Sequence, residues 1–388
     1  MAKKGIKETL LSTLVHGEEI ISSIRVMRKN SNDKISTTSV TAASDRIHPK
    51  QLNLVLNEII DTNENAKILR FISKDGMLPP FEGGQYITVT GEVGGSLTSR
   101  AYSLSSSPSQ RGYYEITVET FPGGFFSKHM VEDLKIGDEV IAYGPNGTFT
   151  YNPVFHKKKS LFLAGGSSIT PFLSQIRETL HKGLDRDIVL LYGSKDYSHC
   201  LYNKEFEEYA KKFPNFKYHL IISEKEDGYN GDVGFLDKEY IAKHCPDYLE
   251  RTAYICGPNV MHYFVKQQLE LLGLKRKDIR DEMFGAPMCL NEEPGYPKGI
   301  TKDQIFNLTV GDKTIPARAD ESILVALERA KIRVNVCCRS GVCSLCRVKL
   351  IKGQVFVANG TLTRQADEKF NYIHSCKSYP ISDLTIEL

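Results

Sequence analysis

The sequence predicts a multidomain chain in which an antiparallel β-barrel is followed by a parallel α/β nucleotide-binding domain and a small β-rich domain around a cysteine loop. Three patterns lead to this fold class. Apolar and polar residues alternate with a period of two from residue 51, as in strands with one buried face. An apolar run near residue 160 ends in a glycine-rich turn, as buried parallel strands do. Cysteines at metal-ligand spacing gather near residue 340.

Composition excludes several classes of protein. The 388 residues carry 50 Lys and Arg against 47 Asp and Glu, a net charge of +3 without a long basic run, so no nucleic-acid binding is expected. No apolar run reaches the roughly 18 residues of a transmembrane span, and no signal segment opens the chain. Nine cysteines, five of them within residues 337–376, indicate reduced thiols and a metal site, so a cytoplasmic location is expected.

Residues 1–50 form an N-terminal extension with its own pattern. Apolar residues recur at helical spacing over 1–28, and a Ser-, Thr- and Asn-rich connector covers 30–44. Nine basic and five acidic residues leave this segment with a net charge of +4. The simpler interpretation is a helix packed on its own protein. The alternative is a helix that contacts a membrane surface or a partner through residues 1–28.

The barrel is expected over residues 51–152. Its alternating strands are separated by Gly and Pro turns, and one helix interrupts them at 127–134. The expected strands cover residues 52–56, 66–72, 85–89, 113–118 and 139–143.

Two motifs within this barrel suit a flavin dinucleotide. Arg100, Tyr102 and Ser103 could supply a cation for a pyrophosphate, an aromatic face for the isoalloxazine and a hydroxyl near N5. Gly123 and Gly124 would let bare amides approach phosphate, and Ser127 could cap the following helix. The alternative for this second motif is an ordinary hairpin turn.

The order of these motifs, followed by Pro145-Asn146-Gly147-Thr148-Phe149, resembles the FAD-binding domain of the ferredoxin-NADP reductase superfamily. The resemblance implies FAD on the barrel. In that family's arrangement, Arg100, Gly123, Gly124 and Ser127 would lie at the pyrophosphate, Tyr102 would stack on the flavin, and Ser103 would lie near N5.

The α/β domain is expected over residues 153–284. An apolar strand at 160–164 runs into Gly165 and Gly166, where Thr170 could cap a helix and Pro171 could occupy its first turn. Free amides there would suit the phosphates of a dinucleotide. The alternative is a purely structural strand-to-helix turn. Further strands are expected at 187–192, 218–223 and 253–256.

Other marks of this domain concern the nucleotide's ribose and nicotinamide. The strand at 187–192 ends in Gly193-Ser194-Lys195-Asp196, where Lys195 suits the 2′-phosphate of NADPH and Asp196 the 2′-hydroxyl of NADH, so both coenzymes stay open. The superfamily's NAD(P)-binding domain is similar in its G-G-x-x-I-T-P, Y-G-S, C-G-P and terminal E-x-F motifs. That resemblance implies NAD(P)H contacts at Cys256-Gly257-Pro258, with Cys256 near the nicotinamide and Glu282 assisting hydride transfer. For Cys256 the alternative is a buried small residue at a strand end.

A Pro- and Gly-containing linker at 285–300 precedes the last domain, residues 301–388. A hairpin, a helix at 322–330 and a cysteine loop follow one another there, an order that looks like the β-grasp ferredoxin fold. Cys338, Cys343 and Cys346 are spaced C-x4-C-x2-C, and Cys376 follows after 29 residues, the ligand pattern of a plant-type [2Fe–2S] cluster. Zinc is the alternative, but no second C-x2-C knuckle exists. Cys337 is expected to be a neighbour rather than a ligand.

Together these parts predict an electron-transfer chain. A nicotinamide delivers two electrons as a hydride and the cluster takes one at a time, so FAD between them fits, because a flavin accepts two electrons and releases them singly. The chain resembles reductases that fuse FAD, NAD and ferredoxin modules, such as the reductases of phenylacetyl-CoA epoxidase, ketosteroid hydroxylase and hybrid-cluster protein. The resemblance implies an NAD(P)H-dependent reductase that serves a separate oxygenase, epoxidase or desaturase component.

Two alternatives concern the electron acceptor and the class of protein. The acceptor could be an anaerobic metalloprotein such as a hybrid-cluster protein, or the chain could be a redox-sensing interaction module. Residues 301–388 carry 13 Lys and Arg against nine Asp and Glu, a net charge of +4. An electron acceptor with an acidic docking face is therefore expected.

Overall fold

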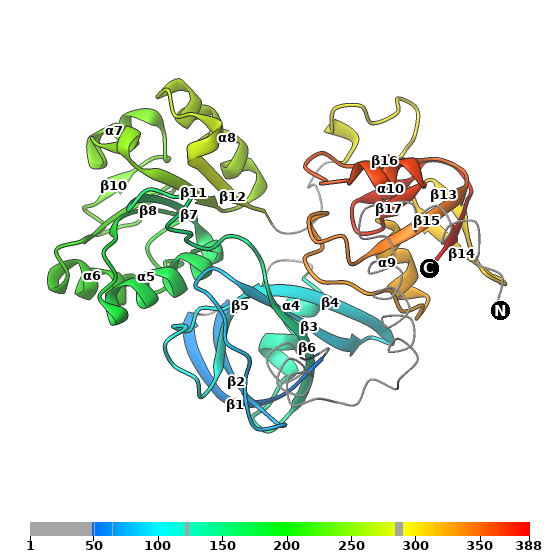
Figure 1. Ribbon diagram of the computed structural model, residues 1–388, viewed down its shortest axis with the longest axis horizontal. Coiled ribbons are helices and arrows are strands. Elements are labelled where there is room, and N and C mark those ends of the chain that lie inside the picture. Colours follow the sequence, from blue (N-terminus) through cyan, green and yellow to red (C-terminus); the bar gives the residue numbers. More distant parts are fainter. Residues whose placement is uncertain (1–48, 50, 64, 121–123, 284–289) are drawn as a thin grey trace, which may run out of the picture. The chain divides into compact units, whose positions relative to one another are not determined.

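The computed structural model describes residues 49, 51–63, 65–120, 124–283 and 290–388. The predicted helix at 1–28, the connector after it, Gly123 and the start of the predicted linker lie outside the described residues. The described strands form four sheets, of which two have six strands, one has five and one has two. Figure 1 shows the three larger sheets following one another along the chain, with helices beside them.

The first sheet is antiparallel throughout, as predicted for the FAD barrel, and its strands lie in the order β4-β3-β6-β1-β2-β5. An isolated antiparallel bridge between Leu104 and Ile116 links the segment after β4 to β5 at the other edge. Inward residues of β1, such as Leu52, Leu54 and Leu56, are at most 5% exposed, so the alternation in the sequence does mark one buried face. The strands are β1 (Leu52–Asn63), β2 (Ala66–Ser73), β3 (Tyr86–Val93), β4 (Ser96–Ser103), β5 (Tyr114–Glu119) and β6 (Glu139–Asn146).

One short helical segment interrupts the barrel close to the predicted place. Helix α4 (Phe126–Lys128) continues directly into the π-helical turn η1 (His129–Asp133). Phe126, Met130 and Val131 are buried in the barrel core, so this segment fills one end of the core.

The second sheet is parallel throughout, with the strand order β10-β9-β8-β7-β11-β12. The chain starts in the middle at β7, builds outward to β10 and then returns to the other side of β7 with β11. Crevices outside the carboxyl ends of strands at such a switch point are where α/β proteins bind ligands. The elements are β7 (Lys159–Gly165), η2 (Gly166–Ile169), α5 (Thr170–Lys182), β8 (Asp187–Ser194), α6 (Asn203–Lys212), β9 (Phe216–Ile222), β10 (Asp232–Val233), α7 (Lys238–His244), η3 (Tyr248–Glu250), β11 (Thr252–Cys256), α8 (Asn259–Leu271), η4 (Arg276–Asp278) and β12 (Ile279–Glu282).

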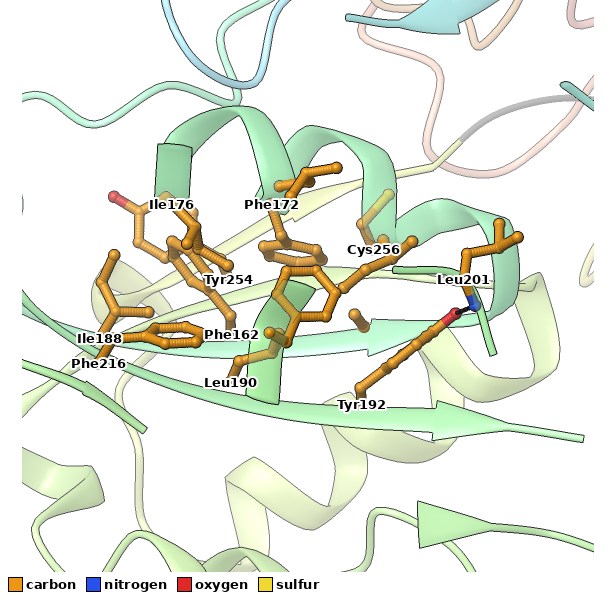
Figure 2. Close-up of a cluster of buried hydrophobic side chains, with 14 of the residues drawn as sticks. Phe162, Phe172, Ile176, Ile188, Leu190, Tyr192, Leu201, Phe216, Tyr254 and Cys256 are labelled. Carbon is orange, nitrogen blue, oxygen red and sulfur yellow. Dashed lines mark hydrogen bonds between the residues drawn. The ribbon is translucent and has the colours of Figure 1, made fainter. Parts of the chain in front are cut away.

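An aromatic cluster fills the space between this sheet and helix α5. Phe162 lies 4.8 Å from Phe172 and 5.3 Å from Tyr254 between ring centroids. Figure 2 shows these rings above the strands, with Cys256 beside them and the Tyr192 hydroxyl hydrogen-bonded to the amide of Leu201. Such packing fixes the ends of the strands from which the nucleotide-binding turns emerge.

The third sheet has five strands in the order β14-β13-β19-β15-β17, and β19 runs parallel to β13 at its centre. Helix α9 covers its core and is N-capped by Ser322, whose hydroxyl accepts from the amide of Val325 at 3.4 Å. Leu290 and Tyr296 of the predicted linker pack against Phe356 and Tyr379 of this domain. The elements are η5 (Leu290–Glu292), β13 (Ile305–Val310), β14 (Lys313–Arg318), α9 (Ile323–Arg329), β15 (Arg347–Lys352), β16 (Val355–Val357), α10 (Gln365–Lys369), β17 (Tyr372–His374), β18 (Ser378–Pro380) and β19 (Leu384–Glu387).

Among the described helices, none is both long and apolar enough to cross a bilayer.

Candidate functional site

A cavity of about 1070 Å³ opens at the carboxyl ends of β7, β8 and β11. Gly165 and Gly166 line it after β7, Gly193, Ser194 and Lys195 line it after β8, and Gly257 and Pro258 line it after β11. Every one of these residues was predicted as a nucleotide contact, and the parallel sheet brings them together because its strands end at one edge. The volume is that of a site for a large organic ligand.

Two of these glycines lie against one side chain. A Cβ atom on Gly165 would lie 2.2 Å from the sulfur of Met261, and one on Gly257 would lie 2.6 Å from the same sulfur. Met261, on α8, lines the cavity. The glycines therefore let α8 approach the strand ends closely, while Gly166, with a φ of 55°, makes the left-handed turn into η2.

The predicted capping role of Thr170 is wrong. Helix α5 begins at Thr170 itself, and its N-cap residue is Ile169 without a side-chain cap. The Thr170 hydroxyl instead donates to the carbonyl of Ser167 at 3.2 Å. Pro171 does occupy the first turn, as predicted, but neither residue lines the cavity, because the 3-10 turn η2 separates them from the glycines.

At the end of the cavity where the adenosine ribose is expected, Lys195 and Asp196 differ in whether they could face a ligand. Lys195 lines the cavity, and its ammonium lies 3.7 Å from the carboxylate of Glu224. Asp196 is engaged in its own turn, where Oδ1 accepts from the amide of His199 at 2.9 Å and from the Ser198 hydroxyl at 2.8 Å. Although burial acts in the opposite direction, the hydrogen bonds from His199 and Ser198 lower the pKa of Asp196 to about 2.

Cys256 and Glu282 lie side by side at the ends of β11 and β12, which pair them in register. Burial, and then the charge of Glu282, raises the pKa of Cys256 well above its ordinary value. Burial, and then the Cys338 thiolate, raises the pKa of Glu282 to about 8, and the Oε2 atom of Glu282 is buried without a hydrogen-bond partner. Burial therefore disfavours the charged form of both groups. Neither lines the large cavity, which ends at Gly257.

The predicted flavin residues of the barrel lie on β4. Arg100 donates to the Thr98 hydroxyl at 2.9 Å and to the Ser99 carbonyl at 2.7 Å. Neither of these hydrogen-bond partners is a carboxylate, although the charge of Glu328 is close enough to favour the cation. Burial, and then the neighbouring Arg339, lowers the pKa of Arg100 to about 10, so it remains a cation at neutral pH. A partly buried guanidinium whose described hydrogen-bond partners are neutral fits a diphosphate.

Tyr102 and Ser103 complete this strand. The Tyr102 ring stacks on Phe126 with 6.5 Å between centroids and 24° between planes, and burial raises the pKa of its hydroxyl. Ser103, 6% exposed, pairs with Tyr86 across β3. The Arg-x-Tyr-Ser run therefore alternates as a strand must, which places Arg100 and Tyr102 on one face and Ser103 on the other.

The predicted cap by Ser127 is wrong, because helix α4 begins at Phe126 and its N-cap is Phe125 without a side-chain cap. Ser127 lies inside the first turn of the helix, so its backbone amide is one of the groups at the helix N-terminus that have no partner within the helix. Gly124 lies just before this helix, and Gly123 is outside the described residues.

The cysteine loop has an unusual backbone. Arg339, Gly341 and Ser344 have φ angles of 54°, 78° and 59° in the left-handed region, although two of them carry side chains. A Cβ on Gly341 would lie 2.9 Å from Lys377 and 3.0 Å from Thr361, so only glycine fits there. The amides of Ser340 and Cys343 point at the Cys338 sulfur at 3.4 Å each. Strain of this kind is typical of loops built to hold a ligand.

The four predicted ligands lie in two pairs. Cys338 and Cys343 belong to one cluster of packed side chains, and Cys346 and Cys376 belong to another. Among the residues that the structure describes, no three or more metal-binding side chains are close enough to hold a single ion. In a [2Fe–2S] core each tetrahedral iron has two bridging sulfides and therefore takes two thiolates. Two pairs of thiols fit the ligand count of that core.

Several cavity residues were not predicted. Ser167 and Ser168 lie in the turn after β7, and Phe235, Asn259, Val260 and Phe264 come from the segment after β10 and from α8. Phe235 is 65% exposed although it is aromatic, and its ring lies 6.3 Å from Phe264. In the sequence, Phe235 is marked by a Gly-Phe pair after a polar loop, and such pairs are too common to indicate a binding residue.

These observations define a class of protein. A parallel sheet with a cavity for a large organic ligand, an antiparallel barrel with a partly buried arginine and a loop with two thiol pairs are the parts of an iron–sulfur flavoprotein oxidoreductase.

Comparison with known domains agrees with this class. Residues 53–151 match the oxidoreductase FAD-binding domain, residues 162–267 the oxidoreductase NAD-binding domain, and residues 308–380 the 2Fe-2S iron-sulfur cluster binding domain.

Whole proteins are similar as well. The glycine betaine monooxygenase reductase subunit of Pseudomonas aeruginosa is 30% identical over 349 residues, which cover 85% of this chain and 93% of that protein. One subunit of the 1,2-phenylacetyl-CoA epoxidase of Escherichia coli is 26% identical over 79% of this chain and 88% of its own length. The solved structure of phthalate dioxygenase reductase, at 25% identity, covers 87% of this chain and 98% of its own with a TM-score of 0.64.

The chain therefore belongs to the family of three-domain reductase components of oxygenase systems. It is an NAD(P)H-dependent oxidoreductase whose cofactors are FAD and a [2Fe–2S] cluster, and it passes electrons from NAD(P)H through these to a separate redox partner.

Proposed function

We propose that the predicted residues of β4 and of the turn before α4 hold FAD. Arg100, Gly123, Gly124 and Ser127 would bind its pyrophosphate, because the Arg100 cation has only neutral described hydrogen-bond partners. Tyr102 would stack on the isoalloxazine, and the hydroxyl of Ser103 would lie near N5. A Tyr102 ring already packed on Phe126 is held rigidly, which suits a stacking platform.

The nucleotide of NAD(P)H would lie in the cavity at the sheet's carboxyl edge. The turns at Gly165 and Gly193 would take its phosphates and ribose, and Gly257 would let the chain approach the nicotinamide. When bound, FAD accepts a hydride's two electrons and releases them one at a time to the cluster. Cys256 and Glu282, whose charged forms are disfavoured by burial, would lie beside the nicotinamide and the flavin.

The cluster would be held by Cys338 and Cys343 on one iron and by Cys346 and Cys376 on the other. Thiolates need donors to balance their charge. The amides of Ser340 and Cys343, which point at the Cys338 sulfur, would supply them.

The acceptor would be an oxygenase component with an acidic docking face. The supporting observation is the surface around the cysteine loop, together with the net charge of +4 on residues 301–388. Val342 and Leu345 on the loop are 47% and 48% exposed, and Leu362, whose amide bonds to the Gly341 carbonyl, is 61% exposed. Arg364 is exposed two residues further on. An apolar surface with an exposed arginine beside it matches a partner whose docking face is acidic.

Ionic strength tests this proposal with two acceptor proteins of opposite charge. Reduction of acidic cytochrome b5 by NADH and the purified chain should slow as salt rises, because screening weakens the attraction. Reduction of basic cytochrome c should not slow. A b5 rate that is independent of salt would contradict the acidic docking face. Rapid turnover with either acceptor would also argue against a redox-sensing module, since a sensor needs no fast turnover.

A charge reversal locates the docking surface. Arg364→Glu should raise the KM for cytochrome b5 about two- to fivefold, the range that one surface ion pair of about 0.5–1 kcal/mol supplies. Lys352→Glu is the matched control, because Lys352 is also exposed but lies at the other end of β15 from the cysteine loop. Equal effects of the two variants would mean that net charge alone, rather than this surface, governs docking.

The location of the protein and the role of its N-terminal extension complete the proposal. A cytoplasmic location fits the eight described cysteines, all of which are free thiols. Residues 1–28 would contact a partner or a membrane surface, as their basic, helically spaced pattern indicates. Binding of the chain, with and without residues 1–48, to anionic vesicles distinguishes the membrane from a protein partner.

A further inference from the structure

One buried contact joins the cysteine loop to the FAD barrel. Cys337 immediately precedes the ligand Cys338 and is 0% exposed. Its carbonyl accepts a hydrogen bond from the Thr88 hydroxyl at 2.8 Å, and its sulfur accepts from the Asn146 amide nitrogen Nδ2 at 3.1 Å. Its thiol also lies 3.7 Å from the hydroxyl oxygen of Tyr86. Thr88 and Tyr86 belong to β3 and Asn146 to β6, so all three partners come from the barrel.

A second contact lies beside the first. Arg339, two residues further along the loop, donates to the hydroxyl of Ser99 on β4 at 3.2 Å. The same guanidinium binds both carboxylate oxygens of Glu328 on α9 at 2.6 and 3.0 Å. Arg339 and Glu328 are 11% and 12% exposed, so this ion pair is largely removed from water. The loop is therefore held on both sides of Cys338.

These contacts reach the strand that carries the flavin residues. Thr88 pairs with Ala101 and Tyr86 with Ser103 across the β3–β4 ladder. Ser99 directly precedes Arg100. A continuous set of hydrogen bonds thus runs from the residue before a cluster ligand to the neighbours of Arg100, Tyr102 and Ser103.

We propose that Thr88, Asn146 and Cys337 form a bridge of positioning residues that fixes the cluster against the FAD barrel and so sets the rate of electron transfer between the two cofactors. The proposal rests on the two-cofactor function derived above. Electron transfer between buried centres slows steeply with the distance between them. If the contact between the two domains could open freely, the rate of electron transfer would depend on the fraction of time that the contact is closed. Buried hydrogen bonds give this contact a defined closed state.

The bridge also accounts for Cys337, which the ligand spacing leaves without a role. A buried thiol that accepts from an amide and donates to a hydroxyl has its hydrogen-bonding capacity satisfied at an interface. Cys337 touches neither iron in this scheme, so its task is to hold the backbone of its neighbour Cys338.

Thr88→Val tests the bridge, because it removes the hydroxyl while keeping the β-branched shape that a buried strand position requires. In stopped flow, flavin reduction by NADH should be unchanged, whereas the following reduction of the cluster should slow about two- to tenfold. Losing one ordinary hydrogen bond of about 0.5–1.5 kcal/mol lowers the population of the closed domain contact, relative to the open one, by about that factor. Hydrogen–deuterium exchange of residues 338–346 should rise by a similar factor in the unreduced protein, a readout that does not depend on turnover.

Two matched variants separate the bridge from general destabilisation. Thr90→Val makes the same change two residues along the same face of β3, where the hydroxyl is buried without a hydrogen-bond partner, so neither readout should move. Thr88→Ser keeps the donor and should restore both readouts. Asn146→Ala breaks the bond to the sulfur from β6 and should act in the same direction as Thr88→Val.

The outcomes are distinct. Unchanged cluster reduction and unchanged loop exchange in both Thr88→Val and Asn146→Ala would overturn the bridge, even if NADH still reduced the flavin. If Thr88→Val lost its flavin, the rate of cluster reduction in Asn146→Ala would decide whether the bridge exists. Failure of the proposed function would look different, because then wild-type cluster reduction would not follow flavin reduction at all.

Discussion

Replacing Arg177 with Met should destabilise the FAD and NAD(P) domains by about 3–5 kcal/mol, because it leaves a buried carboxylate without its main partner. Arg177 on α5 donates to Glu115 Oε1 at 2.6 Å and to both oxygens of Glu205 at 2.7 and 2.8 Å. The Glu115 side chain on β5 is 1% exposed. Without Arg177, its remaining ion-pair partner among the described residues is Arg70 at 2.8 Å.

The expected change is large enough for a simple assay. For domains of 150–250 residues, 1 kcal/mol lowers the Tm by about 2–4 °C, so Arg177→Met should lower it by about 6–20 °C. Flavin fluorescence and circular dichroism on heating both report this transition. Lys182→Met is the control on the same helix. Lys182 and its partner Glu178, 2.7 Å apart, are 40% and 22% exposed, so their pair should contribute at most about 1 kcal/mol.

The same network predicts a pH dependence. Although burial acts in the opposite direction, the charge of Arg177 and its hydrogen bond hold the pKa of Glu115 below its ordinary value. A carboxyl whose folded pKa is depressed stabilises the fold above its unfolded pKa and loses that contribution as pH falls toward the folded value. Stability should therefore fall below about pH 4.5 in the wild type, and by less in Glu115→Gln. If Arg177→Met and Lys182→Met lowered the Tm equally, the network would not stabilise the fold as argued.

Three further variants test the cofactor sites. Cys343→Ser should abolish the cluster's visible and EPR spectra yet keep NADH-to-ferricyanide activity, because the flavin precedes the cluster; loss of that activity with FAD still bound would reverse the order of carriers. Arg100→Ala should lower the flavin retained after desalting, since the pyrophosphate loses its cation, and full retention would remove Arg100 from the site. Cys256→Ala should slow flavin reduction in stopped flow with flavin and cluster contents unchanged, and an unaltered rate would leave Cys256 a packing residue.

Strand prediction worked where burial follows a regular pattern and failed where that pattern breaks. The sequence predicts the first strand only to residue 56, whereas β1 continues to Asn63. A register shift between Leu56 and Glu58 marks a bulge, which moves later residues to the other face and ends the alternation. Strand β12 was missed because its Asp281 faces Lys266 and Arg276 in ion pairs, so the strand carries little apolar signal.

The sites were predictable to different degrees for physical reasons. Ligand spacing in the cysteine loop is local, so Cys338, Cys343 and Cys346 could be assigned from sequence. The assignments of Thr170 and Ser127 as caps failed because α5 and α4 each begin at or before the predicted cap, and helix ends cannot be placed to one residue from sequence alone. The partners of Cys337 lie about 190 to 250 positions away in the chain, and no local pattern marks them.

The central place of β19 has a consequence for how the protein is made. This strand lies between β13 and β15, yet it is the last strand of its sheet to leave the ribosome. Cys338, Cys343 and Cys346 are translated some forty residues earlier, before the sheet that supports them can close. Until β19 is in place, the three thiols lie on a segment whose supporting sheet is unfinished. Expression conditions that limit iron supply would therefore leave a yellow apoprotein with its flavin domain intact.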